Sequence, residues 1–334
     1  MMKLRDIARK AQVSEATVSR VINNYPYVKE ETRQRVLSVI EKNNFKPNQI
    51  ARGMRIKKTH TIGLLIANIT NPFYAEAATT VMNIADQYGY TVIICITNND
   101  PQKQEEYIKI LQQRKVDGFL FGSVLLKDPY VKGLIKSGVP YVLFNRIFKN
   151  NDGINYVSLD NKLGLSLLVE HLVSLGHKRI AFIRGCQAFS TSEERYQGYI
   201  STLNKLGLEY KPEFVIEGES NEEISYRVTK KLLDEKHGIT AIIAANDLMA
   251  LSALEAISRC NLRVPEDIAL VGFHDIEIAK HQSIQLTTVG HNTFKMSEIA
   301  TQSLIQLIEG NKNLVQVVLK PQLLIRRTCG AQIK

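Results

Sequence analysis

From residue 61 onward the chain alternates short apolar runs with longer amphipathic stretches, and this alternation constrains its fold more than any other feature. Continuous apolar runs are typical of strands that are buried on both faces of a parallel sheet. The stretches between them have helical periodicity, which predicts sheets covered by helices on both faces. The predicted strands form two series, at 62–68, 90–96, 117–122 and 139–144, and then at 179–184, 240–245 and 267–273.

Two series of strands predict two lobes, divided near residues 158–161. In open parallel sheets, ligands bind beyond the carboxyl ends of the strands. A cleft between two such lobes is a natural small-molecule site that can close on its ligand, so we expect a site there. The polar residues at the predicted strand ends are Asn71, Ser123, Arg146, Asn246 and His274. The helices predicted between the strands include 73–88, 102–114, 162–175, 192–206 and 247–260.

The N-terminal sixth of the chain carries nearly all of its excess charge. Residues 1–58 contain 14 Lys and Arg residues against 5 Asp and Glu residues, a net charge of +9, whereas the whole chain of 334 residues has +10. A basic end on a nearly neutral body indicates a polyanionic partner. Charge alone fits a membrane surface as well as a nucleic acid, and the residue pattern decides for the nucleic acid.

The basic segment predicts three short helices. The first has apolar residues at the i, i+3, i+4, i+7 spacing of one helix face. Ser14 is a suitable N-cap for the second helix, and the third is expected at about 30–43. The apolar positions predicted to form their common core are Leu4, Ile7, Ala8, Ala11, Val18, Val21, Ile22, Val36, Leu37 and Ile40.

The second of these helices is predicted to present a short polar face outward, which suits insertion into the major groove of DNA. Arg20 can contact a guanine through two hydrogen bonds, and Thr17 and Ser19 can bind phosphates. On spacing alone, an ordinary three-helix bundle with a solvated polar face remains the alternative. The concentration of basic residues in this segment favours DNA binding.

Residues 47–59 predict a conditional hinge between the basic segment and the body. Asn48 can cap a helix over 49–55, which is too short to be stable alone, and Gly53 weakens it by about 1 kcal/mol relative to Ala. We expect this helix to become ordered when it pairs with a second copy and with DNA, placing Met54 as an apolar wedge between base steps. A flexible basic linker is the alternative.

Several classes of function have no signature in the sequence. We expect a cytoplasmic protein without a membrane partner, because there is no N-terminal signal segment and no apolar run of about 18 residues. The four cysteines form no CxxC pair and the histidines have no ligand spacing, so no metal or cofactor is expected. Enzyme motifs such as GxGxxG and GxSxG are absent. A transport-type solute-binding protein is the runner-up, but it has no use for a basic headpiece.

Motifs along the whole chain resemble the lactose/galactose repressor (LacI/GalR) family of transcription regulators. They include MKLRDIARKAQVSEATVSRVIN and KPNQIARGM near the N-terminus, and LGHKRIAFIRG, AANDLMALSALEAI and VPEDIALVGF in the body. The resemblance runs from about Lys3 to Arg327 in the family's order. It implies an all-α helix-turn-helix headpiece at 1–46, a hinge at 47–59, and a periplasmic-binding-protein-like core at 60–334.

In this family the chain crosses between the two α/β lobes of the core more than once. The resemblance therefore implies an N-lobe of about 60–158 and 293–322, and a C-lobe of about 161–290 and 323–334. It also implies a homodimer, in some members a tetramer, that binds a palindromic operator in double-stranded DNA. The residues predicted to bind DNA are Ser14, Glu15, Ala16, Thr17, Ser19, Arg20, Asn23, Asn48, Ala51 and Met54.

The family's effector contacts map onto polar and aromatic residues of the predicted cleft. An aromatic ring can stack on a sugar or base, and Arg195 can bind hydroxyls or an anion. The alternatives are that Phe73 is a core residue and that Asp160 caps the helix that begins at Lys162. The residues predicted to bind the effector are Phe73, Tyr74, Ser123, Arg146, Asp160, Thr191, Arg195, Asn246 and His274.

Two positions depart from the sugar-binding members, which often carry Asp where this chain has Asn145 and His274. Loss of both carboxylates leaves Arg146, Arg195 and a protonated His274, which favours an anionic carbohydrate such as a phosphosugar or sugar acid. One alternative is a neutral ligand, with His274 bonded to a neighbouring backbone group. Another is that the main signal is a phosphorylated carrier protein bound to the body, as in the catabolite-control branch of the family.

Overall fold

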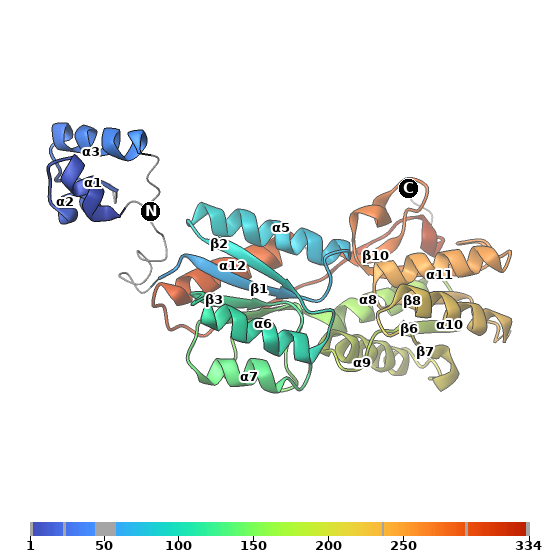
Figure 1. Ribbon diagram of the computed structural model, residues 1–334. Helices are drawn as coiled ribbons and strands as arrows, with labels where there is room; N and C mark the ends of the chain where they lie inside the picture. The colour runs from blue at the N-terminus through green and yellow to red at the C-terminus, as the bar shows by residue number, and fades with distance from the viewer. Residues whose placement is uncertain (1–2, 23–24, 44–57, 236, 291–292, 332–334) are drawn as a thin grey trace. The chain divides into compact units, whose positions relative to one another are not determined.

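The computed structural model describes residues 3–22, 25–43, 58–235, 237–290 and 293–331 (Figure 1). The chain separates into two compact units, divided between Thr59 and His60. None of the helices in the described ranges is long and apolar enough to span a membrane.

The N-terminal unit contains the three predicted helices, α1 (Leu4–Lys10), α2 (Glu15–Ile22) and α3 (Glu30–Lys42). The Ser14 hydroxyl accepts a hydrogen bond of 3.1 Å from the backbone N–H of Thr17, which confirms the predicted cap of α2. The residues buried in its core are Ile7, Ala8, Ala11, Val18, Val21 and Val36, with Leu4, Val13, Ile22, Val28, Val39 and Ile40 partly buried around them.

One core prediction for this unit is wrong. Leu37 is 40% exposed, whereas its neighbour Val36 is fully buried. The inward face of α3 contains Val36, Val39 and Ile40, which follow the i, i+3, i+4 spacing of one helix face. Leu37 is turned away because consecutive helical residues are about 100° apart around the axis.

The first lobe of the body is built on a six-stranded parallel sheet of order β11-β5-β4-β3-β1-β2. Alternate residues of its strands point to opposite faces, so Leu64 packs in one cluster and Leu65 in another. Helices α5 and α12 cover one face, and α6 and α7 cover the other (Figure 1). The strands are β1 (Thr61–Ile66), β2 (Thr91–Ile96), β3 (Gly118–Phe121), β4 (Tyr141–Phe144), β5 (Tyr156–Leu159) and β11 (Gln316–Leu319). The helices are α5 (Pro72–Gln87), α6 (Pro101–Gln113), α7 (Pro129–Lys136) and α12 (Thr293–Ile308).

The second lobe has a six-stranded sheet of order β12-β10-β9-β8-β6-β7, in which only β12 is antiparallel to its neighbour. Helices α8 and α9 pack together, as do α10 and α11. The strands are β6 (Ile180–Arg184), β7 (Val215–Glu217), β8 (Ala241–Ala244), β9 (Ala269–His274), β10 (Thr287–Gly290) and β12 (Gln322–Leu324). The helices are α8 (Asn161–Ser174), α9 (Ser190–Lys205), α10 (Glu222–Asp234) and α11 (Asp247–Arg259), with the short turns η1 (Pro212–Phe214), η2 (Glu277–Lys280) and η3 (Arg327–Cys329).

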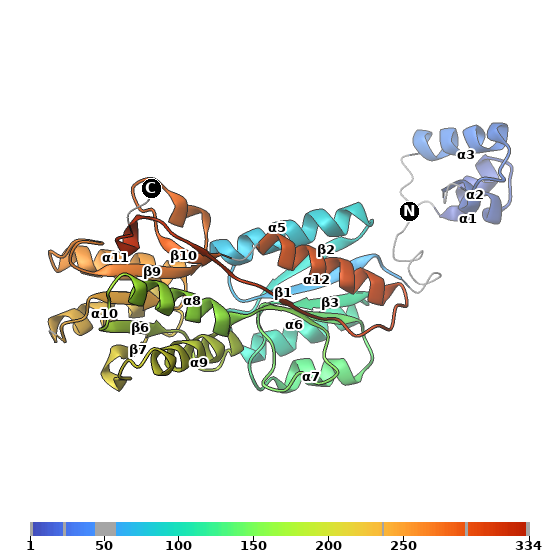
Figure 2. The same ribbon diagram turned by 180° about the vertical axis from the view of Figure 1, so that it is seen from behind.

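The chain passes between the lobes three times: between β5 and α8, between β10 and α12, and between β11 and β12 (Figure 2). Consequently the late helix α12 packs on α5, although their sequences are about 200 residues apart. A small helical unit and two parallel-sheet lobes are the fold class that the sequence predicts. The crossings place the carboxyl ends of both sheets at the junction of the lobes.

Candidate functional site

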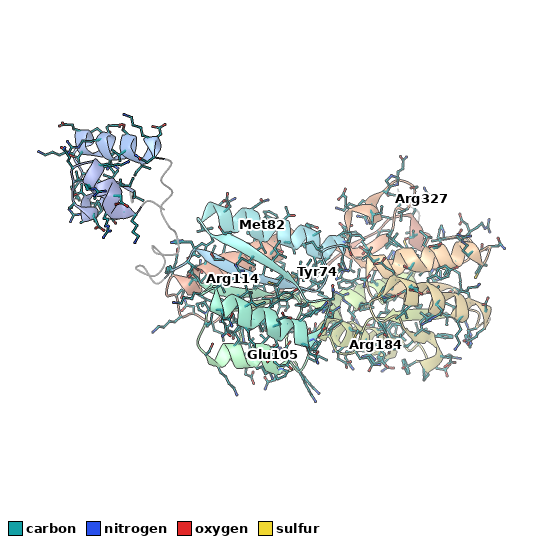
Figure 3. The ribbon with its side chains drawn as sticks, viewed as in Figure 1. Tyr74, Met82, Glu105, Arg114, Arg184 and Arg327 are labelled. Atoms are coloured by element: carbon teal, nitrogen blue, oxygen red, sulfur yellow. The ribbon has the colours of Figure 1, made fainter. Side chains whose placement is uncertain are left out.

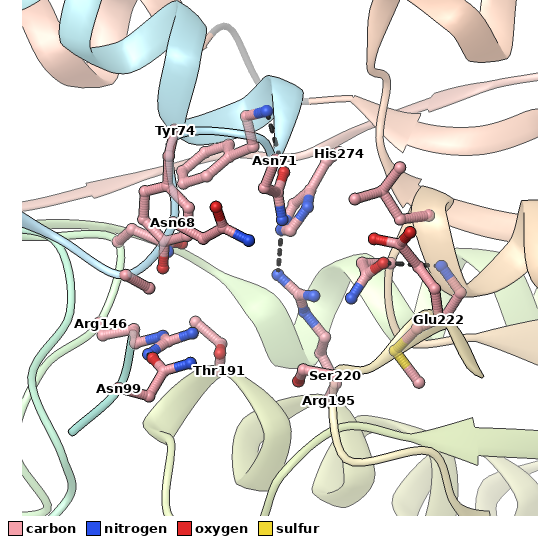
Figure 4. A pocket seen from close by; sticks show the side chains of 16 residues that line it. Asn68, Asn71, Tyr74, Asn99, Arg146, Thr191, Arg195, Ser220, Glu222 and His274 are labelled. Atoms are coloured by element: carbon pink, nitrogen blue, oxygen red, sulfur yellow. Dashed lines mark hydrogen bonds between the residues drawn. The ribbon is translucent and has the colours of Figure 1, made fainter. Parts of the chain in front are cut away.

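A cavity of about 110 Å³ lies at that junction, between the carboxyl ends of the two sheets (Figure 4). Both lobes contribute to its walls, and Tyr74 and Arg146 face Arg195 and His274 across it. Figure 3 places Tyr74 at the same junction in the whole chain. The lining residues are Ala67, Asn68, Asn71, Phe73, Tyr74, Asn99, Asn145, Arg146, Thr191, Arg195, Ser220, Glu222, Asn246, Leu248, Met249 and His274.

Seven of the nine residues predicted to bind an effector line this cavity, and Ser123 and Asp160 do not. The Ser123 hydroxyl is buried and lies 3.2 Å from the Thr97 hydroxyl. The Asp160 carboxylate accepts a hydrogen bond of 2.9 Å from the backbone N–H of Leu163 and caps α8. Asp160 therefore holds the start of the second lobe, which is the alternative role considered for it.

Arg195 is the most enclosed charged group of the cavity wall. Its Nε donates to Asn161 Oδ1 at 3.0 Å, one Nη donates to the carbonyl of Ala245, and the other lies 2.9 Å from His274 Nε2. Burial lowers the pKa of Arg195 to about 9, although Glu194 and Asp247 act in the opposite direction. The guanidinium remains charged at neutral pH, and three of its donors are occupied within the second lobe.

The contact with Arg195 determines the protonation state of His274. A guanidinium has only donors, so His274 Nε2 must accept, and the ring is neutral with its proton on Nδ1. This geometry does not support the predicted protonated His274. The ring also stacks on Phe73 of the first lobe, with 4.9 Å between centroids, so Phe73 is a wall of the cavity and an interlobe contact. The φ of +120° at His274 is strained for a residue with a side chain.

Asp247 fixes the turn that follows His274. Its carboxylate accepts hydrogen bonds from the Thr288 hydroxyl at 2.7 Å and from the backbone N–H of Ile276 at 2.9 Å. The absence of a side chain at Gly272 leaves room for it, because a Cβ there would lie 2.2 Å from the carboxylate. Burial raises the pKa of Asp247 to about 6, against the opposing effect of these hydrogen bonds.

Arg146 enters the cavity from the first lobe and is 7% exposed. Its Nη1 donates to Asn99 Oδ1 at 2.6 Å. Its guanidinium carbon lies 3.5 Å from the ring centroid of Phe189, which belongs to the second lobe. Neighbouring Asn145 has a left-handed backbone, with φ at +65°, at the carboxyl end of β4. Arg146 is thus held from both lobes.

Amide and hydroxyl groups make up most of the remaining polar wall. Asn71 caps α5 through Phe73 N–H, and Asn246 caps α11 through Met249 N–H. Each cap uses the side-chain oxygen, which leaves the amide nitrogens as possible donors to a ligand. Sequence reasoning missed Asn68, Asn99, Ser220 and Glu222. Asn68 follows β1 and Asn99 follows β2, so a systematic search of strand ends would have found both.

In the N-terminal unit, α2 presents the predicted recognition face. Glu15, Ala16 and Arg20 are exposed, whereas Thr17 and Ser19 are half-buried. The exposed Ser14 hydroxyl lies 2.9 Å from that of Thr17, so both are engaged locally. Four further residues predicted to bind DNA lie outside the described residues, namely Asn23, Asn48, Ala51 and Met54. Among the residues that the structure describes, no cluster of His, Cys, Asp and Glu could hold a metal ion.

The fold defines a class of protein in which a helix-turn-helix unit and a two-lobed core like that of periplasmic binding proteins lie on one chain. Residues 3–48 match the family described as bacterial regulatory proteins, lacI family, and residues 169–329 match the periplasmic binding protein-like domain. The chain belongs to the lacI family of DNA-binding transcription regulators.

Similar proteins match along the whole chain. The chain is 35% identical to the ribose operon repressor of Halalkalibacterium halodurans over 309 residues, which is 92% of this chain and 91% of that protein. It is 31% identical to the transcriptional repressor PurR of Haemophilus influenzae over 338 residues, 98% of each. The solved lac repressor dimer bound to operator and the anti-inducer ONPF has a TM-score of 0.89 at 27% identity, covering 99% of each chain. These matches confirm the predicted family and fold class, and the two relatives are repressors rather than enzymes.

Proposed function

We propose that this protein is a cytoplasmic repressor that binds a palindromic operator as a dimer and is controlled by a small polar effector in the interlobe cavity. The observation that carries the proposal is that both lobes of one chain supply the walls of the cavity. A ligand bound there has different contacts in the closed and open arrangements, so it shifts the population between them. The whole-length similarity to a dimer bound to operator supports the DNA half of the proposal.

The chemistry of the wall favours a neutral polyhydroxy molecule over a strongly anionic one. His274 is neutral in its contact with Arg195, and three donors of Arg195 are already occupied. Glu222 adds a carboxylate to the lining and opposes an anionic group. Apart from the Arg146 guanidinium, whose Nη1 donates to Asn99, the remaining donors and acceptors are amides and hydroxyls, which suit sugar hydroxyls. The similarity to a ribose operon repressor supports the same class.

The size of the cavity favours a small ligand. Sites for drug-sized ligands enclose roughly 300–1,000 Å³, whereas this cavity encloses about 110 Å³. We therefore propose a monosaccharide-sized effector rather than a disaccharide or a nucleotide. We favour a small effector over a phosphorylated carrier protein as the signal, because the effector has a cavity with named lining residues, whereas we propose no binding surface for a carrier protein.

Two linked measurements on the full chain test the proposal. Selection from random duplex DNA should enrich a palindromic sequence, and Arg20→Ala should lose that enrichment. Operator affinity is then measured with D-ribose, D-ribose 5-phosphate and D-gluconate. A coupling of about 1–3 kcal/mol corresponds to a change of roughly 5–150-fold, and the same factor must appear in ligand affinity when DNA is bound.

The results separate the two halves of the proposal. Enrichment of no sequence would contradict the DNA-binding role. A response only to the phosphate or the acid would contradict the neutral class and return the anionic carbohydrate to first place. Asn246→Ala should reduce the response, whereas Ser123→Ala is the matched control because the Ser123 hydroxyl lies outside the cavity wall.

A further inference from the structure

The segment that joins β6 to α9 forms an interlobe seam on the Arg146 side of the cavity. The backbone N–H of Leu126 donates to the Ala188 carbonyl at 2.9 Å. The backbone N–H of Ile147 donates to the Ser190 hydroxyl at 3.0 Å. Two first-lobe donors therefore bond to the second-lobe segment, one on each side of Phe189.

Phe189 occupies the centre of this seam but is not a cavity wall. Its side chain is 4% exposed, and the Arg146 guanidinium lies over its ring at 3.5 Å. Arg146 itself lines the cavity. Phe189 can thus affect a bound ligand through the position of Arg146.

The second lobe fixes the segment that carries this ring. The Ser192 hydroxyl donates to the Gly185 carbonyl at 2.7 Å, and the backbone N–H of Cys186 donates to the Ser220 hydroxyl at 3.3 Å. Preceding Arg184 is 2.6 Å from Glu193. The position of the ring is consequently determined by the second lobe, whereas the guanidinium that it contacts belongs to the first.

We propose that Phe189 is a positioning residue that holds the Arg146 guanidinium at the cavity wall when the lobes are closed. This inference rests on the proposed binding of an effector in that cavity. An arginine over an aromatic face is attracted by the negative charge of the ring's π-system, and the attraction increases as water is excluded. Separation of the lobes removes the ring from Arg146 and leaves its first-lobe contact with Asn99, so the arginine has both of its orienting contacts only in the closed arrangement.

The competing explanation is that Phe189 simply fills space in the core. The two explanations differ in what a leucine would do, because leucine retains apolar bulk but has no π face. Phe189→Leu should weaken ligand binding about tenfold, and Phe189→Tyr should restore it to near the wild-type value. Phe182→Leu is the matched control, since Phe182 is fully buried in the second lobe and stacks on Tyr199 rather than on an arginine.

The first experiment measures the affinity of the full chain and these variants for D-ribose by calorimetry, with the midpoint of thermal unfolding as a second readout. We expect both leucine variants to lower the unfolding midpoint, but only Phe189→Leu to lower affinity. Equal affinity in the wild type and Phe189→Leu would overturn the positioning role. If the wild type binds neither D-ribose nor D-ribose 5-phosphate, the effector class proposed above fails instead.

A second experiment tests the contact without any ligand. The sequence contains no tryptophan, so Phe189→Trp introduces the only indole of the chain. Removal of the guanidinium from the ring by Arg146→Ala in that background should expose the indole to water and shift its emission to longer wavelength. The control Lys149→Ala, at an exposed position of the same strand-end segment, should leave emission unchanged. Emission that does not respond to Arg146→Ala would overturn the proposed contact.

Discussion

Replacement of Asp247 by asparagine should make the stability of the body less dependent on pH in a calculable way. Asp247 is completely buried, and its pKa rises from 3.8 to about 6 on folding. The folded state therefore binds this proton more tightly than the unfolded state. For a carboxyl group of this kind, stability is highest when the group is protonated and falls as pH rises through the interval between the two pKa values.

The magnitude follows from the interval. A shift from 3.8 to about 6 corresponds to about 3 kcal/mol at 1.36 kcal/mol per pKa unit. At pH 4.5 about one third of this stabilisation has already been lost through ionisation of Asp247. The remaining part, about 2 kcal/mol, should be lost between pH 4.5 and pH 8. Asparagine resembles the protonated carboxyl group and does not titrate. The free energy of unfolding of Asp247→Asn, relative to that of the wild type, should therefore be about 2 kcal/mol higher at pH 8 than at pH 4.5.

The assay is urea unfolding of both proteins at pH 4.5 and pH 8, followed by far-UV circular dichroism. All other titrating groups are common to both proteins, so their contributions cancel in the difference. A constant offset of about 1–3 kcal/mol is also expected, because the amide nitrogen cannot accept from Thr288 or Ile276 and one donor loses its partner. A difference between the two proteins that is the same at both pH values would refute the reasoning, since it would show that burial does not raise the pKa of Asp247.

Three other predictions follow from contacts and exposure. Arg20→Ala should lower affinity for the selected operator by about 1–3 kcal/mol while leaving affinity for random duplex DNA within a few-fold, and gel-shift titrations that show an equal loss on both DNAs would contradict base recognition. Arg195→Lys should abolish the effect of D-ribose on operator binding without changing operator affinity in the absence of ligand, because one ammonium cannot replace the three separate contacts of the guanidinium. If the same titration with D-ribose added shows that the response is retained, the effector site lies elsewhere. Leu37→Lys should change the stability of the N-terminal unit by less than about 0.5 kcal/mol, whereas Val36→Ala should lower it by about 1.5–3 kcal/mol. Thermal unfolding in which Leu37→Lys is the less stable variant would disprove the assigned buried face of α3.

The interior of the fold was predictable because its strands carry an unambiguous signal. Strands such as β3 and β8 are buried at every position, so they appear in the sequence as uninterrupted apolar runs. The strands that were not predicted are β5, β7, β10 and β11. Two of them, β7 and β11, are three or four residues long and only partly buried, whereas β5 and β10 are buried but contain serine or threonine, which interrupts the apolar run. Both β7 and β11 are edge strands with one neighbour, and their polar residues resemble those of loops.

The site was predictable in its location and in many of its residues, but not in its electrostatics. The rule that ligands bind at strand ends leads to Arg146 and Asn246 without any structure. The charge of His274 depends on Arg195, which is 79 positions away in sequence. No periodicity links two such positions, so the protonated ring inferred from the departure from sugar-binding family members could not be tested until the two side chains were seen in contact.

The three crossings between the lobes also have a consequence for synthesis of the protein. Residues up to β3 leave the ribosome early, but α12, which covers the same face as α5, is made only after most of the second lobe. At roughly 5–20 residues per second, translation takes on the order of 10–35 s to pass from residue 121 to residue 293. During that time the apolar surface that later receives Met296, Leu304 and Ile305 has no cover. The nascent chain is therefore most prone to aggregation late in translation, and truncation before Thr293 should yield a protein that requires chaperones even though its second lobe is nearly complete.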